Sequence, residues 1–173
     1  MTEQAGLSPG AGTLAKGPSA APQLQFAFEI AIELSPRLRY GPNIWGLERG
    51  FVGVTGGTVS GPMLNGIVMP HTGGDWPTVR GSDNTVRFDA RYLLQADDGT
   101  IIELVNKGVR TGSKDVLQRL NDYQPVDPSE YYMALTPTFD APAGPHEWLS
   151  TAVFIGKADR REKRSVFTYW MVL

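Results

Sequence analysis

Residues 73–94, with the sequence GGDWPTVRGSDNTVRFDARYLL, carry the densest set of side chains that could do chemistry. Here Gly73 and Gly74 lead into Asp75 and Trp76, and a glycine-led loop can present side chains to a cavity rather than to a sheet. A carboxylate beside an indole can act as a general base, because an apolar neighbour raises the pKa of an acid. The alternative is structural: Asp75 caps a turn through its own backbone, and Trp76 plugs one end of the fold.

The strand that follows alternates charged and apolar residues. Asp89 and Arg91 project to one face together with Arg87, and Glu103 joins them if the next strand pairs as a hairpin. If this face lines a cavity, Arg91 can clamp a carboxylate or enolate oxygen while Asp89 or Glu103 handles a proton. If the face is solvated, Asp89 and Lys107 form only a cross-strand ion pair worth at most about 1 kcal/mol. The opposite face would then be a core stripe made of Phe88, Ala90, Tyr92 and Leu94.

Further polar and aromatic residues are candidate ligand contacts. Tyr92, Asn106 and Arg110 share one face of the predicted hairpin and can offer hydrogen bonds to a ligand, unless Arg110 lies past the strand end in solvent. In the SEYY element, Tyr131 and Tyr132 point to opposite sides. An inward phenol, the role we assign to Tyr132, can donate to a carbonyl oxygen and stabilise an enolate. The alternative is that both rings serve packing.

The chain has two histidines, His71 and His146, whose spacing matches no metal motif. We therefore expect no metal site unless the two meet in space with carboxylates. His71 stands just before the glycine-led loop and adds an imidazole that can titrate near neutral pH, so it is a candidate ligand contact. Trp148 is a further candidate contact, with a core or dimer position as the alternative.

Short segments of period two predict strands over most of the chain. In LQFAFEIAIEL, residues 24–34, one face holds Leu24, Phe26, Phe28, Ile30 and Ile32. The segment SKDVLQRLNDYQ predicts one brief helix, with Ser113 as its N-cap and an end before Pro125.

Residues 85–110 form the clearest unit, two alternating strands joined around the turn residues Asp97, Asp98 and Gly99. If Leu94 pairs with Ile102, the register sets Tyr92 against Leu104, Ala90 against Asn106, Phe88 against Gly108, Leu93 against Glu103, Arg91 against Val105 and Asp89 against Lys107. Many short strands, one helix and abundant Gly and Pro predict an all-β, mainly antiparallel barrel. We expect one such domain over residues 24–173 behind a flexible tail over residues 1–23.

Composition narrows the function classes. The net charge of −2 gives no electrostatic drive toward nucleic acid or anionic lipid, and the absence of cysteine excludes disulfides and thiolate chemistry. No apolar run has the length of a membrane span, so we expect a cytoplasmic protein. Phosphate-binding glycine loops and the GxSxG elbow of serine hydrolases are also absent from the sequence.

Five signatures in a fixed order resemble a known family: TGGTVSGPMLNGIVMP, GGDW, FDARYLLQADDGTIIELVNKGVR, VDPSEYYMALTPTF and HEWLSTAVFIGKADR. The chain is similar to the small β-barrel proteins of the domain of unknown function 3237 family. The resemblance implies a calycin-like or allene-oxide-cyclase-like barrel, a pocket at its mouth, no required cofactor and a homodimer. The chain departs from the family in its longer N-terminal tail and in His71 and Thr72, which precede Gly73 where the family has a shorter turn.

These observations lead to the hypothesis of a cofactor-independent enzyme that binds a small carbonyl-containing or polycyclic metabolite in the barrel. It would act as an isomerase, cyclase or lyase by proton transfer, with Asp75 as the base, Arg91 and Tyr132 as oxyanion stabilisers and Trp76 as a wall. Two alternatives stay open. One is a non-catalytic carrier or sensor with an apolar lumen, and the other is an interaction protein whose dimer surface uses strand edges.

Overall fold

The computed structural model describes residues 21–122, 124–160 and 164–173. Nearly all of the tail predicted for residues 1–23 lies outside the described residues. Among the residues that are described, no helix has the length and apolar character needed to cross a membrane.

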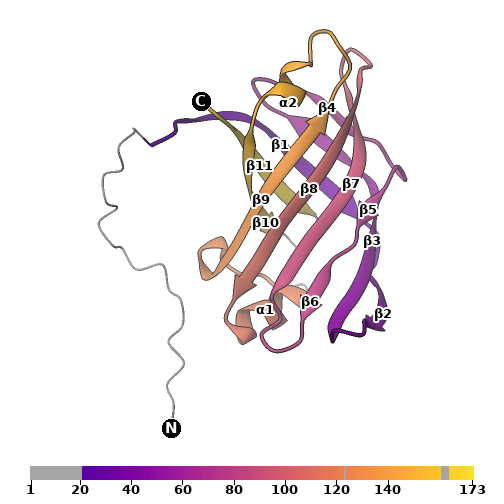
Figure 1. Cartoon of the computed structure of the whole chain (residues 1–173), viewed down its shortest axis with the longest axis vertical. Helices are drawn as coiled ribbons and strands as arrows, with labels where there is room; N and C mark the ends of the chain where they lie inside the picture. Colours follow the sequence, from indigo (N-terminus) through magenta and orange to yellow (C-terminus); the bar gives the residue numbers. More distant parts are fainter. Residues whose placement is uncertain (1–20, 123, 161–163) are drawn as a thin grey trace.

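The described chain forms a closed, eight-stranded antiparallel β-barrel, which confirms the predicted fold (Figure 1). One position in the barrel wall, between β3 and β7, is shared by the short segments β4 (Gly66–Val68), β5 (Gly74–Asp75) and β6 (Thr78–Arg80). Pairing of β1 with β3 closes the sheet on itself, while β2 (Leu38–Pro42) pairs with the first part of β3. The long strands are β1 (Leu24–Leu34), β3 (Leu47–Ser60), β7 (Val86–Ala96), β8 (Ile101–Gly112), β9 (Tyr131–Asp140), β10 (Phe154–Arg160) and β11 (Ser165–Val172).

Short helices lie at the two ends of the barrel (Figure 1). Helix α1 (Lys114–Asn121) follows β8 and begins as predicted at Ser113, whose Oγ accepts a hydrogen bond of 3.3 Å from the Val116 N–H. Its apolar face, which includes Leu117, is buried. Helix α2 (Trp148–Thr151) lies at the opposite end, and the 3₁₀ turn η1 (Pro128–Glu130) precedes β9.

The predicted register of the β7–β8 hairpin is confirmed. Leu94 pairs with Ile102, Tyr92 with Leu104 and Ala90 with Asn106. Because directly paired residues point to the same side of a sheet, this register fixes which side chains enter the barrel. The inner face carries the stripe of Phe88, Ala90, Tyr92 and Leu94. The outer face carries the charged residues Arg87, Asp89, Arg91, Glu103 and Lys107.

Strand β1 differs from its predicted pattern at its start. Phe28, Ile30 and Ile32 are buried, but Leu24 and Phe26 are exposed. The cause is a bulge between Phe26 and Phe28, where the pairing with β11 shifts register. A bulge inserts one unpaired residue and so reverses the side to which all earlier side chains point.

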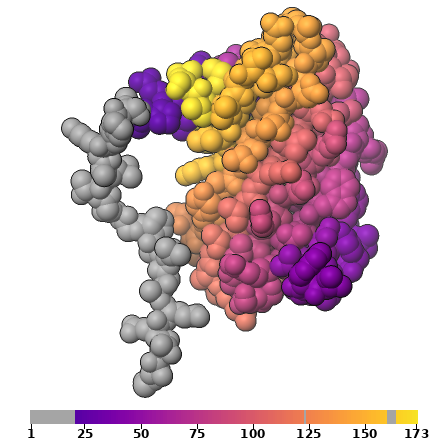
Figure 2. All heavy atoms as spheres, viewed as in Figure 1, coloured from indigo at the N-terminus to yellow at the C-terminus, as the bar shows by residue number. Residues whose placement is uncertain are grey.

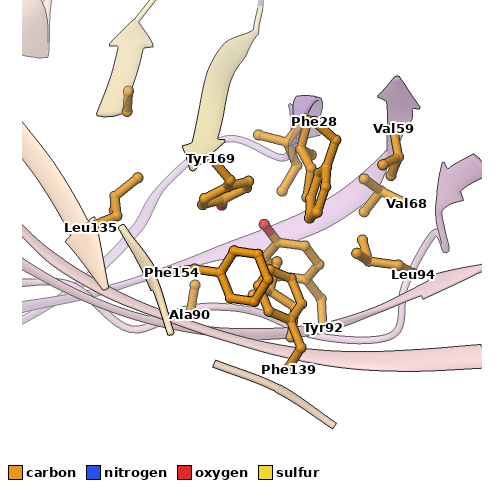
Figure 3. Close-up of a cluster of buried hydrophobic side chains, with 14 of the residues drawn as sticks. Phe28, Val59, Val68, Ala90, Tyr92, Leu94, Leu135, Phe139, Phe154 and Tyr169 are labelled. Carbon is orange, nitrogen blue, oxygen red and sulfur yellow. The ribbon is translucent and has the colours of Figure 1, made fainter. Parts of the chain in front are cut away.

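The end of the barrel near α2 is filled by an aromatic cluster (Figure 3). Phe139 packs edge-on against Phe28, Phe154 and Tyr169, with ring centroids 5.7, 5.1 and 6.1 Å apart. These residues come from four different strands, so they tie the wall together across the interior. On the outside, side chains cover the wall formed by β7, β8 and β9 (Figure 2).

Candidate functional site

A cavity of about 440 Å³ occupies the half of the barrel nearer α1. This volume lies within the range of pockets that enclose small molecules. Pro36 and Arg164 are exposed at its rim, whereas Tyr92 and Asn106 are buried at its inner end. The lining is mostly apolar and comprises Ile32, Leu34, Ser35, Pro36, Arg37, Val52, Val54, Asp75, Pro77, Val79, Val86, Phe88, Ala90, Tyr92, Asn106, Met133, Leu135, Arg164, Ser165 and Phe167.

Asp75 reaches the cavity because β5 fits tightly between two neighbouring strands. It pairs with Val52 of β3 on one side and with Ala90 of β7 on the other. A Cβ atom on Gly73 would overlap the carbonyl oxygen of Arg91, and one on Gly74 would press against the backbone of Val52. The glycine pair therefore lets the short segment come close enough to its neighbours to place the carboxylate inside.

The Asp75 carboxylate is half-buried among apolar side chains. Its Oδ1 accepts a hydrogen bond of 3.0 Å from the backbone N–H of Asp89. Burial raises the pKa of Asp75 from 3.8 to about 6, although the Asp89 N–H and the positive charges of Arg37 and Arg110 act in the opposite direction. The group is thus mostly ionised at neutral pH, but its conjugate acid is stronger than water by many orders of magnitude.

A polar group of three side chains lies at the inner end of the cavity. Asn106 Nδ2 donates a hydrogen bond of 2.8 Å to the Tyr169 hydroxyl. Tyr92 points its hydroxyl toward Tyr169 (Figure 3). Burial raises the pKa of both phenols above the ordinary value of 10, so each is a neutral hydrogen-bond donor at physiological pH.

Two arginines contribute positive charge near the carboxylate. Arg37 lines the cavity, and Arg110 is buried on β8 with its guanidinium 6.0 Å from the centre of the Phe88 ring. Arg110 Nη2 donates a hydrogen bond of 3.0 Å to Asn121 Oδ1 at the end of α1. Arg110 therefore lies inside the barrel and not in solvent past the strand end, the alternative that the sequence left open.

The structure does not bring Arg91, Asp89 and Glu103 to this cavity. Arg91 projects from the outer face, where its Nη2 lies 2.7 Å from Glu103 Oε2, and Lys107 Nζ lies 3.8 Å from Asp89 Oδ1. The physical reason is the strand alternation: Arg91 pairs with Gly74 and Val105, whereas the inward positions are those of Ala90 and Tyr92. Asp75 and Arg91 thus point to opposite sides of the wall, and we do not assign Arg91 to the site.

Trp76 and Tyr132 also lie on the outer surface. Trp76 is 42 % exposed and packs against Phe51 with ring centroids 5.1 Å apart, and Tyr132 is 56 % exposed. Together with Asp89 they border an open outer hollow of about 1110 Å³. Tyr131, whose ring is buried, is the inward member of the tyrosine pair.

The remaining candidates lie away from the cavity lining. His71 is exposed, in a turn where its φ is 61°. Trp148 packs on Phe154 at the α2 end, with ring centroids 5.7 Å apart, and His146 Nε2 lies 3.1 Å from Asp98 Oδ2. Among the described residues, no group of three or more His, Asp or Glu side chains is placed to hold a metal ion.

Sequence reasoning missed two residues of the interior, Arg37 and Tyr169. Tyr169 lies in RSVFTYWMVL, a segment so apolar that the tyrosine resembles packing. Arg37 stands in a proline- and glycine-rich stretch that predicts a loop. Period-two alternation did offer a signal for Tyr169, because it places Phe167, Tyr169 and Met171 on one face of the strand.

With the site described, the family can be assigned. Residues 22–172 match the family model described as protein of unknown function (DUF3237). The chain belongs to this family.

Relatives of known sequence and structure support the same assignment. A UPF0311 protein of Rhodopseudomonas palustris (strain TIE-1) is 30 % identical over 151 residues, which cover 87 % of this chain and 97 % of the relative. The crystal structure of a β-barrel-like protein from Acinetobacter baumannii is 31 % identical, with a TM-score of 0.77 over 90 % of this chain and 98 % of that chain.

One relative has a name that states an activity. The hydroalkoxylation enzyme phnH of Penicillium herquei is 27 % identical over 154 residues, which cover 87 % of this chain and 84 % of the relative. Barrels similar to this one therefore include an enzyme.

Proposed function

We propose that this protein is an enzyme that transfers protons on a small, largely apolar molecule bound in the barrel cavity. The observation that carries the proposal is the placement of Asp75, the one carboxylate among the described residues that line the cavity. Burying a carboxylate among apolar side chains costs free energy. Acidic groups with a shifted pKa inside a pocket commonly serve as proton donors or acceptors in catalysis.

The geometry suits general acid–base chemistry. With a pKa of about 6, Asp75 can accept a proton at neutral pH and return it later in the same reaction. Negative charge that develops on a ligand oxygen can be stabilised by the neutral phenol of Tyr92 or by the guanidinium of Arg37, two residues that line the cavity. In this assignment Tyr92 takes the oxyanion role that the sequence suggested for Tyr132.

The named relative supports this reaction class. A hydroalkoxylation adds the O–H group of an alcohol across a carbon–carbon double bond, so that a C–O bond forms and the hydroxyl proton ends on carbon. Atoms and electrons balance without an oxidant or reductant, and one acid–base group can carry the proton. An addition, cyclisation or isomerisation of this kind would agree with the hypothesis drawn from the sequence.

A Kemp elimination tests the proposal without knowledge of the natural substrate. In the probe 5-nitrobenzisoxazole, a base removes the ring C–H proton while the N–O bond breaks, and a coloured cyanophenolate forms. We expect wild type to catalyse this reaction with a rate that rises with pH through about 6, because the ionised Asp75 is the base. Asp75→Asn should lower kcat/KM by about 100-fold, the order of effect of a positioned base.

Glu103→Gln is the matched control, because it neutralises a carboxylate on the outer face. It should leave the elimination rate within about twofold of wild type. Equal rates for wild type and Asp75→Asn would reject Asp75 as the base. Saturable binding of the probe without any turnover would favour the non-catalytic carrier, which the mostly apolar lining also suits.

A further inference from the structure

The open outer hollow that Trp76 and Tyr132 border carries a local excess of positive charge. Among the described residues that line it, one side chain is acidic, Asp89, and four are cationic: Arg49, Arg87, Lys107 and Lys157. Asp89 lies 3.8 Å from Lys107, whereas the other three cations form no ion pair within the described chain. A basic surface therefore exists on the outside of the barrel although the whole chain has a net charge of −2.

Strand pairing places three of these cations in a single row across the outside of the sheet. The row consists of directly paired residues from β3, β6, β7, β8, β9 and β10, namely Arg49, Thr78, Arg87, Val109, Ala134 and Lys157. Neighbouring strands are about 4.8 Å apart, so the row is about 24 Å long from Arg49 to Lys157. The short side chains of Val109 and Ala134 lie between the cations and form the floor of the hollow.

A second row, two residues further along each strand, carries aromatic rings at its ends. Its members are Trp76, Asp89, Lys107, Thr136, Ile155 and Trp170. Trp76 is exposed and Trp170 is half-buried, and both border the hollow. Residues two apart on a strand are about 6.7 Å apart, so the row with the rings and the row of cations run side by side.

A row of cations beside exposed rings fits a single strand of nucleic acid better than a smaller or a like-charged partner. Phosphates can follow the cations while unstacked bases lie on the rings, and each nucleotide joins the two. A free nucleotide has one base and cannot reach both Trp76 and Trp170, which are five strand positions apart. A second copy of the chain that used the same face would set like charges against each other.

We propose that the outer hollow binds single-stranded nucleic acid over a length of about four nucleotides, the lower end of the site sizes of small barrel domains. Phosphates contact Arg49, Arg87 and Lys157, and bases stack on Trp76 and Trp170. The described lining contains no Asn or Gln side chain to read base edges, so binding depends little on base sequence. The proposal goes beyond the acid–base activity in the barrel interior.

Binding of a fluorescein-labelled oligothymidylate of about 12 nucleotides, followed by fluorescence anisotropy, tests the proposal. The affinity should fall about 20-fold between about 50 and 200 mM salt, as expected for three phosphate contacts on a single strand. Lys157→Gln should weaken binding and reduce this salt effect to about sevenfold, because one contact is lost. Lys114→Gln is the matched control, since it removes an exposed lysine from α1 and should change neither quantity.

A ring variant separates stacking from attraction between charges. Trp76→Leu should weaken binding about tenfold at each salt concentration and leave the salt effect at the wild-type value, because stacking releases no counterions. Linear polyphosphate of the same charge has no bases, so it should compete with the oligonucleotide at least about tenfold more weakly than unlabelled oligothymidylate does.

Four outcomes would overturn the proposal. They are no binding at about 50 mM salt, a wild-type salt effect in Lys157→Gln, equal competition by polyphosphate and oligothymidylate, and binding to anionic phospholipid vesicles in place of the oligonucleotide. Sedimentation of the ligand-free protein tests the remaining occupant. Self-association that Trp76→Leu abolishes and that the oligonucleotide does not disturb would assign the hollow to a second copy and would also overturn the proposal.

Discussion

At the scale of single residues, two opposing effects act on the ionised form of Asp75 in the cavity. Removing a carboxylate from water disfavours its ionised form, and the Asp89 N–H and the nearby arginines offset only part of that cost. The folded protein therefore holds the Asp75 proton more tightly than the unfolded chain does. Stability from this group is fully present below pH 3.8 and is lost as the pH rises through about 6.

Asp75→Asn should abolish this pH dependence, because the amide stays neutral and its oxygen can still accept the Asp89 N–H. Relative to wild type, the variant should gain up to about 3 kcal/mol of unfolding free energy between pH 4 and pH 7, the equivalent of two pKa units. Urea unfolding at a series of pH values measures the difference. A wild-type-to-variant difference that is flat over this range would show that the Asp75 pKa is not raised in the folded state.

At the scale of elements, features that depend on local sequence could be predicted, whereas features that depend on contacts distant in sequence could not. The β7–β8 hairpin could be predicted residue by residue, since a tight turn and an apolar stripe fix its register. Which face of the hairpin enters the barrel depends on closure of the whole sheet. The local sequence therefore left two assignments open, with either the charged face of Arg91 or the apolar face of Tyr92 turned to the interior. The apolar stripe was the correct signal. The bulge in β1 and the pairing of β5 with two long strands arise from contacts distant in sequence, which a period-two pattern does not contain.

The close fit of β5 between its neighbouring strands requires glycine at position 73, because a Cβ atom there would overlap the carbonyl oxygen of Arg91. Gly73→Ala should cost about 1–3 kcal/mol of stability, the usual range for overpacking, and should shift Asp75 from its place. Gly81→Ala is the matched control, since a Cβ at Gly81 meets no atom within 4 Å. Urea unfolding and the Kemp rate check both variants, and equal behaviour of the two would contradict the close fit of β5.

At the scale of the whole molecule, the barrel interior divides into a packed end and a hollow end. The packed end holds the aromatic cluster of Phe28, Phe139, Phe154 and Tyr169, and the hollow end holds Asp75 and the apolar lining. Tyr169 and Asn106 lie where the two meet, joined by their hydrogen bond. This division implies that truncating a side chain of the packed end mainly lowers stability, whereas truncating an apolar side chain of the hollow end mainly changes ligand binding.

Two truncation variants, one at each end of the barrel, test whether the two ends differ in their effects on stability and on binding. Phe154→Ala removes a ring that is 2 % exposed and packs on Phe139 and Trp148, so it should cost about 3–5 kcal/mol while the Kemp rate per folded molecule stays near wild type. Val52→Ala removes a half-buried side chain that borders the cavity, so it should cost about 1 kcal/mol or less and change KM for 5-nitrobenzisoxazole. Urea unfolding and steady-state kinetics on the same samples give both quantities. If Phe154→Ala changed KM more than Val52→Ala did, the packed end would be part of the binding site and the division would be wrong.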